Sequence, residues 1–134
     1  MVEADGYVLR IKTEKWVNQV FSMTIYYTSL RRIWKPSQTI VFLHKTNVGD
    51  AIIGYGEIEN IYDKSELSDE EIRECEKYGW KKAIVFKYVK PLKPLPIKET
   101  FLKDLGLSGK YLHGLKLNKE QLISIIDQAE RLQS

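Results

Sequence analysis

The sequence feature that most constrains the fold is a pair of apolar segments joined by a short turn. Residues 38–45 include four consecutive apolar side chains, residues 51–58 alternate in character, and an Asn-Val-Gly-Asp turn separates them. This pattern predicts two strands that form a hairpin. Gly54 and Gly56 fall on one face of the second strand. Glycine weakens a strand, so we expect this face to approach another backbone closely, to bend sharply or to leave room for a ligand. We also expect that no large core side chain covers it.

The composition predicts one soluble domain spanning residues 1–134. No apolar run is long enough to span a bilayer, and no signal peptide is recognisable. The single Cys75 favours a reducing, cytoplasmic compartment and is too isolated to suggest a nucleophile. One cysteine and two distant histidines give no zinc ligand cluster, so we predict neither a metal nor a cofactor.

The remaining periodicities predict a mixture of strands and helices. We expect strands at residues 7–12, 24–29, 82–90 and 111–117, and helices at residues 14–23, 69–78, 97–105 and 119–132. Three prolines after residue 90 predict an extended crossing. Strands this few, with connections this short, favour an α+β fold: a small mixed β-barrel with flanking helices.

Charge is segregated along the chain. Residues 7–45 contain seven basic residues and one acid, residues 50–76 contain ten acids, and residues 81–119 contain ten lysines and two acids. If the two basic segments meet in space, with the acidic segment turned elsewhere, they form a surface suited to a polyanion. The alternative is that the lysines only solubilise the surface.

Three segments carry a resemblance to a known superfamily. They are residues 7–13 with the helix that follows, the pair of strands at 39–45 and 52–58, and the strand with its Pro-Ile exit at 82–97. In order and spacing they resemble the PUA-like superfamily of small β-barrels, in particular its EVE, YTH and ASCH branches. An archaeal PUA-like domain is the nearest branch. The resemblance implies binding of RNA or of a modified base.

The resemblance also implies a site. Relatives hold a base between aromatic walls beside the barrel, and the matching position for the first wall is Tyr26 or Tyr27. The second wall would come from Tyr62 or Trp80. Two groups of polar residues match positions where relatives contact the ligand: Lys12 and Thr13 at the end of the first strand, and His44 before the turn.

The residues themselves point to the same region. Tyr26, Tyr27 and Trp34 are interleaved with basic residues, which is the pattern of a surface that binds phosphates and bases. The basic residues are Arg31, Arg32 and Lys35. The alternative is that these aromatic side chains fill the core, as we predict for Phe42, Phe86 and Trp16. His44 can equally be a structural residue, and His113 can contact a phosphate or cap a turn.

We therefore predict binding of RNA or a modified nucleobase through a basic, aromatic-lined cleft, without catalysis. One alternative is an ASCH-like hydrolase of a modified nucleoside, which would use Lys12 and Thr13 with Glu57 or Glu59. Another is a protein-interaction module that docks through the acidic helix at residues 69–76. Nucleic-acid binding should weaken steeply with salt, whereas a protein interface should depend on salt less.

Overall fold

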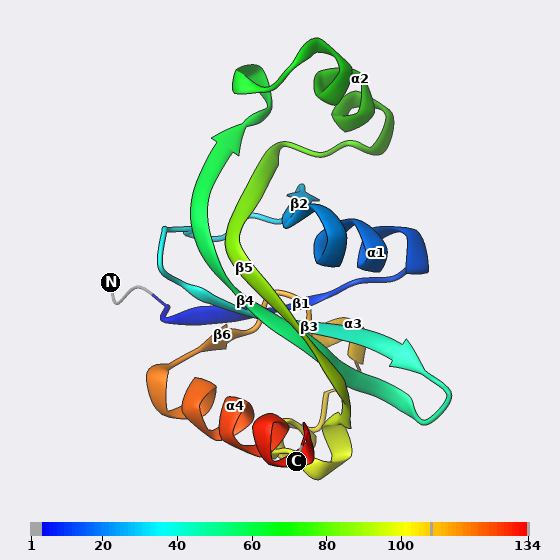
Figure 1. The fold of residues 1–134 in the computed structure, drawn as a ribbon, viewed down its shortest axis with the longest axis vertical. Coiled ribbons are helices and arrows are strands. Elements are labelled where there is room, and N and C mark those ends of the chain that lie inside the picture. The colour runs from blue at the N-terminus through cyan, green and yellow to red at the C-terminus, as the bar shows by residue number, and fades with distance from the viewer. Residues whose placement is uncertain (1–3, 108, 134) are drawn as a thin grey trace.

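The computed structural model describes residues 4–107 and 109–133, which form an α+β fold built on one mixed sheet (Figure 1). Its strands are β1 (Gly6–Arg10), β2 (Ile25–Thr28), β3 (Thr39–Thr46), β4 (Gly49–Asp63), β5 (Lys82–Pro96) and β6 (Lys116–Leu117). Its α-helices are α1 (Glu14–Met23), α2 (Asp69–Tyr78), α3 (Gly109–Leu112) and α4 (Lys119–Gln133). Short 3-10 helices occupy Lys64–Glu66, Ile97–Glu99 and Phe101–Leu105.

The six strands follow the order β2-β5-β4-β3-β1-β6. Strand β1 runs parallel to β3, and every other neighbouring pair is antiparallel. The hairpin of β3 and β4 lies at the centre, as its apolar sequence predicts. The α+β class is confirmed, but the sheet is open: β2 and β6 are its two edges and do not pair with each other to close a barrel.

Two hydrophobic clusters lie on opposite faces of the sheet. One contains Phe42, Ile58 and Phe86 and packs against helix α1 through Val17 and Val20. The other contains Val41, Leu43 and Ile52 and packs against helix α4 through Leu122 and its neighbours on the same helical face. Neighbouring residues of β3 thus contribute to opposite clusters, which explains why this strand is apolar at consecutive positions. Figure 1 shows α1 and α4 covering the two faces.

The glycine face of β4 packs tightly inside the protein. A Cβ atom at Gly54 would lie 2.7 Å from the carbonyl oxygen of Lys90 and 2.8 Å from the ring of Phe21. At Gly56 the nearest atom would be the carbonyl oxygen of Tyr88, at 2.6 Å. The register between β4 and β5 shifts next to Gly54 and again between Glu57 and Ile58, so the strand is also irregular in this region. The expectation of close backbone approach is confirmed, but the expectation of no large covering side chain is wrong, because Phe21 covers Gly54.

Strands β4 and β5 extend beyond the rest of the sheet and carry α2 at their far end (Figure 1). Ser68 accepts a hydrogen bond from the backbone of Glu71, whose carboxylate accepts one from Ser68 in return, and Gly79 ends the helix in the left-handed conformation. The sequence predicts both ends of this helix. Cys75 is its buried residue.

Three expected elements differ from those observed. The helix expected at residues 97–105 is two short 3-10 helices, Ile97–Glu99 and Phe101–Leu105. Strand β5 continues through Pro91 and Pro94 to Pro96. At the bulges, some residues of β4 and β5 have no partner in the opposite strand. Residues 111–117 form the end of α3, a turn at Gly114 and the two-residue strand β6 instead of one strand. The turn arises because the backbone N–H of Gly114 donates to Val8 and that of Val8 donates to Leu115.

Within residues 4–107 and 109–133, no helix is long and apolar enough to cross a bilayer. In the same ranges, no group of three or more His, Cys, Asp or Glu side chains is placed to hold a metal ion.

Candidate functional site

A cavity of about 560 Å³ opens where the end of β1, the start of α1, strand β2 and helix α3 meet. Its wall combines aromatic and basic side chains. The lining residues are Arg10, Ile11, Lys12, Thr13, Trp16, Gln19, Tyr26, Tyr27, Thr28, Ser29, Leu30, Trp80, Lys110 and His113. Five of the eleven residues that the sequence analysis selects lie together here: Lys12, Thr13, Tyr26, Tyr27 and Trp80.

Stacked rings form the aromatic side of the cavity. Tyr27 and Trp80 lie nearly parallel, with their centroids 5.2 Å apart and their planes at 13°. Trp80 also stacks with Tyr78 at 4.7 Å, and Trp16 meets Trp80 edge-on at 5.0 Å. Each such ring pair contributes to the stability of the fold beyond the effect of the apolar area that it buries. Of the two residues proposed for the second wall, Trp80 therefore lines the cavity, whereas Tyr62 lies on β4 and accepts a hydrogen bond from Asn60.

The aromatic side is anchored to the core and to the acidic helix. Tyr26 packs against the hydrophobic cluster that contains Phe42 and Phe86, and burial raises the pKa of its hydroxyl to about 12. The hydroxyl of Tyr27 donates to Glu71 of α2 at 2.8 Å. Burial and this hydrogen bond raise the pKa of Tyr27, and the same bond holds the pKa of Glu71 below its usual range. Both tyrosines thus stay neutral at physiological pH.

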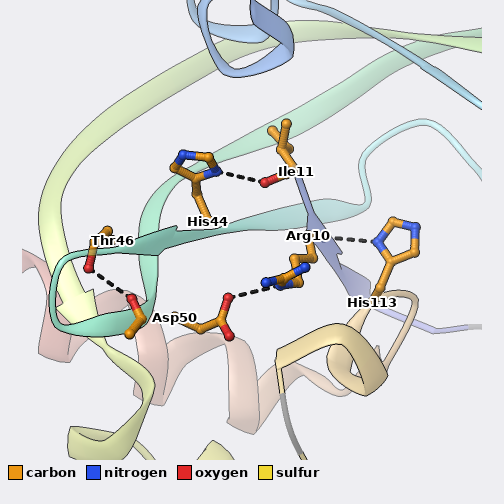
Figure 2. Close-up of polar contacts among 7 residues, drawn as sticks. Arg10, Ile11, His44, Thr46, Asp50 and His113 are labelled. Carbon is orange, nitrogen blue, oxygen red and sulfur yellow. Dashed lines mark hydrogen bonds and ion pairs between the residues drawn. The ribbon is translucent and has the colours of Figure 1, made fainter. Parts of the chain in front are cut away.

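The opposite side of the cavity is basic. Arg10, at the end of β1, is bound on two sides, as Figure 2 shows. Its Nε donates to Asp50 Oδ1 at 2.8 Å, and its backbone N–H donates to His113 Nδ1 at 2.9 Å. Burial and the nearby cations Arg32, Lys12 and Arg10 lower the pKa of His113. The ring is therefore neutral at pH 7, with its proton on Nε2.

The other selected residues lie outside the lining of this cavity. Trp34 is in the core, where it meets Tyr7 edge-on at 4.9 Å, because the segment after β2 turns inward. Arg31 and Lys35 are exposed. Arg32 donates from Nε to the carbonyl of Gly114 at 2.8 Å, beside His113, and does not line the cavity.

His44 holds two strands together. Its Nδ1 contacts the carbonyl oxygen of Ile11 at 2.7 Å (Figure 2), while Nε2 is 3.9 Å from the carboxylate of Glu14. The imidazole therefore ties β3 to the chain just after β1. This is the structural role that the sequence analysis kept open for His44, and its side chain is not among the lining residues of the cavity.

Nine of the fourteen lining residues are not among those selected from the sequence, and one of the nine, His113, was considered only as a phosphate contact or a turn cap. Trp16 was assigned to the core because its neighbours Val17 and Val20 are apolar, yet it lies half-buried at the cavity. Arg10, Lys110 and His113 join the site through the pairing of β1 with the C-terminal segment. A signal for Arg10 was available, because it alternates with buried Leu9 at the end of a strand.

A second cavity of about 500 Å³ lies across the aromatic wall. Both cavities share Trp16, Gln19, Tyr27 and Trp80, but the second adds Glu70, Glu71 and Glu74 of α2. The acidic helix is therefore next to the basic cavity and not on a remote face. The cavity lined by Arg10 and Lys12 has no carboxylate among its described lining residues. Glu57 and Glu59, required by the hydrolase alternative, lie on β4 and do not line it.

The comparisons with known proteins bear on the fold. Neither a family model nor a curated protein matches the sequence. Among solved structures, ASCH from Zymomonas mobilis aligns with a TM-score of 0.66 and 16% identity, over 90% of this chain and 92% of that chain. The chain therefore has the same fold as this bacterial ASCH protein. Two variants of the same bacterial protein, one with tyrosine changed to phenylalanine and one with serine changed to alanine, align with TM-scores of 0.65.

The structures of the two variants also align with most of this chain. They share 16% and 15% identity with this chain, over 90% and 93% of its length and 95% and 98% of their own.

Proposed function

We propose that the protein binds RNA or a modified nucleobase in the cavity between β1, α1 and β2, without catalysis. One observation carries this proposal: a single cavity has stacked aromatic rings on one side and cations with uncommitted donors on the other. A base offers a π face to the rings and acceptor atoms to the donors. Phosphates of the same strand would meet the exposed lysines at the rim.

The chemistry of the lining supports binding over hydrolysis. General acid–base catalysis needs a group that exchanges a proton near neutral pH within reach of the ligand. The described lining holds no carboxylate, both tyrosines have raised pKa values, and the pKa of His113 is lowered. Lys12 and Thr13 are left without the glutamate that the hydrolase alternative combines with them.

A binding titration tests the proposal directly. Fluorescence anisotropy with labelled single-stranded RNA should give saturable binding that weakens steeply as salt increases. The variant Trp16→Leu keeps an apolar helix-forming residue but removes one aromatic ring from the cavity wall. We expect it to weaken binding by roughly 1–3 kcal/mol, the usual contribution of one base stacked on one ring.

The matched control is Tyr88→Leu, which removes an exposed aromatic residue of β5 that does not line the cavity. It should bind RNA like the wild type. Equal binding by wild type and Trp16→Leu, with both proteins folded, would contradict the proposal. Chromatography of the RNA and of free ribonucleosides after incubation should show no new product, and turnover would favour the hydrolase instead.

A further inference from the structure

We propose that the basic end of this cavity is a phosphate subsite, so that the ligand is a nucleotide and not a bare base or nucleoside. The subsite consists of Arg10, Lys12, Lys110 and His113, all of which line the cavity. This inference rests on the proposed function and deepens it, because it adds a phosphate to the base that the aromatic side would hold.

Arg10 is the fixed element of the subsite. Its side chain is 17% exposed and is held by Asp50, which is 16% exposed, through Nε alone. Among the described residues its two Nη groups make no hydrogen bond. A guanidinium presents its donors in a planar fork that matches two oxygens of a phosphate. Arg10 is thus positioned by one carboxylate and keeps donors for a second anion.

His113 supplies a directed donor. The backbone N–H of Arg10 occupies Nδ1, so the neutral ring carries its proton on Nε2. The ring lines the same cavity as the Arg10 side chain, and the nearby Arg32 is fixed by Gly114. Because the donor tautomer is set by backbone geometry, the Nε2–H is available for an oxygen acceptor without prior rearrangement.

Lys12 and Lys110 add positive charge to the lining of the cavity. Both ammonium groups belong to exposed residues, and Lys110 lies 4.9 Å from the ring of Tyr111. Thr13 precedes α1, yet its side chain makes no capping hydrogen bond to the helix, so its hydroxyl is uncommitted there. The end of the cavity opposite the stacked rings is therefore rich in donors and cations, and its described lining residues include no carboxylate.

Calorimetry with matched ligands tests the phosphate subsite. The ligands are adenosine, guanosine, cytidine and uridine, their 5′- and 3′-monophosphates, inorganic phosphate alone, and a short single-stranded oligoribonucleotide. For the preferred base, a monophosphate should bind at least about tenfold tighter than its nucleoside, as expected for charge-assisted hydrogen bonds. Tighter binding of the oligonucleotide than of either monophosphate would assign the phosphate to a strand; the reverse order would assign it to a free nucleotide.

Two variants locate the effect. Lys12→Ala changes an exposed residue and should weaken monophosphate binding more than nucleoside binding, so that the monophosphate advantage falls several-fold. His113→Asn keeps an acceptor for the Arg10 backbone N–H but cannot extend a donor as far into the cavity, and it should reduce the same advantage. The matched control is Lys87→Ala, which removes one positive charge from an exposed residue of β5 that does not line the cavity. This variant should bind the monophosphate as much tighter than the nucleoside as the wild type does.

The outcomes separate the two proposals. If nucleosides bind, Trp16→Leu weakens them and the monophosphates bind no tighter, the phosphate subsite is refuted and the proposed function stands. If Lys87→Ala reduces the advantage as much as Lys12→Ala, the effect is general electrostatics and the subsite is again refuted. If no nucleoside, nucleotide or oligonucleotide binds, the proposed function itself fails.

Discussion

Tyr27 lies flat against Trp80, with ring centroids 5.2 Å apart, although the two residues are more than fifty positions apart in the chain. Tyr27 is on the edge strand β2, and Trp80 lies between the end of α2 and the start of β5. Their contact therefore joins the segment that carries α2 to strand β2 at the wall of the cavity. It is reinforced at the other end of the Tyr27 side chain, where the hydroxyl donates to Glu71. The position of α2 and the shape of the cavity are therefore coupled through one tyrosine.

Removing the hydroxyl of Tyr27 should loosen this coupling. Tyr27→Phe keeps the stacked ring but deletes the hydrogen bond to Glu71, which should lower the free energy of unfolding by about 0.5–1.5 kcal/mol. Urea denaturation measures the change. The control is Tyr78→Phe, because the Tyr78 hydroxyl makes no hydrogen bond within ranges 4–107 and 109–133. If both variants lose the same stability, the Tyr27–Glu71 bond contributes nothing specific.

The ion pair beneath the cavity should matter more than one at the surface. Arg10 and Asp50 are about one-sixth exposed, so Asp50→Ala leaves a mostly buried guanidinium without its partner. We expect a loss of about 3 kcal/mol, the lower end for breaking a buried pair. The pair of Lys82 and Asp63 is 43% and 62% exposed, and Lys82→Met should cost less than about 1 kcal/mol. Chemical denaturation of the two variants gives the comparison, and similar losses would contradict it.

Local sequence signals predicted much of the fold. The spans of α1 and α2 and the start of α4 depend on neighbouring residues, and all agree with the structure. The open sheet did not follow, because closure depends on whether distant edge strands meet. The irregular path of β5 also did not follow, because bulges allow prolines to remain in a strand that the proline pattern would otherwise end.

The site was predictable only in part for the same reason. Tyr26, Tyr27, Lys12 and Thr13 were selected from the resemblance and lie together in the cavity. Trp34 has the same basic neighbours as those tyrosines but lies in the core, since flanking charges do not determine the direction in which a side chain points. His113 comes from a segment near the other end of the chain and reaches the cavity only through a backbone contact with Arg10. The spacing of these two residues along the sequence does not indicate that contact.

Gly54 should be intolerant of any side chain. Gly54→Ala would place its Cβ against the Lys90 carbonyl and the Phe21 ring, so we expect a loss of about 1–3 kcal/mol from overpacking. Thermal and urea unfolding measure it. Adding Phe21→Leu relieves the ring contact but not the backbone contact, so the double variant should remain less stable than Phe21→Leu alone. Full recovery would show that the strand backbone can move, which contradicts the close approach of β5 described above.

The pH dependence of stability should reveal the neutral state of His113. Its pKa is lowered from the usual value of 6.5, chiefly by burial and further by Arg32, Lys12 and Arg10. As pH falls below about 6.5, the unfolded chain binds a proton at this histidine before the folded protein does. The contribution of neutral His113 is therefore fully present above pH 6.5 and is lost as pH falls towards its folded pKa.

The variant His113→Asn isolates this contribution. Asparagine can accept the Arg10 N–H bond but does not titrate, while all other ionisable groups remain in both proteins. The free energy of unfolding of the wild type minus that of the variant should therefore decrease as pH falls from 7.5 to 5. Urea denaturation at several pH values provides the difference. A difference that stays constant, or grows in acid, would mean that His113 is not held neutral, and the donor assigned to its Nε2 in the phosphate subsite would lose its basis.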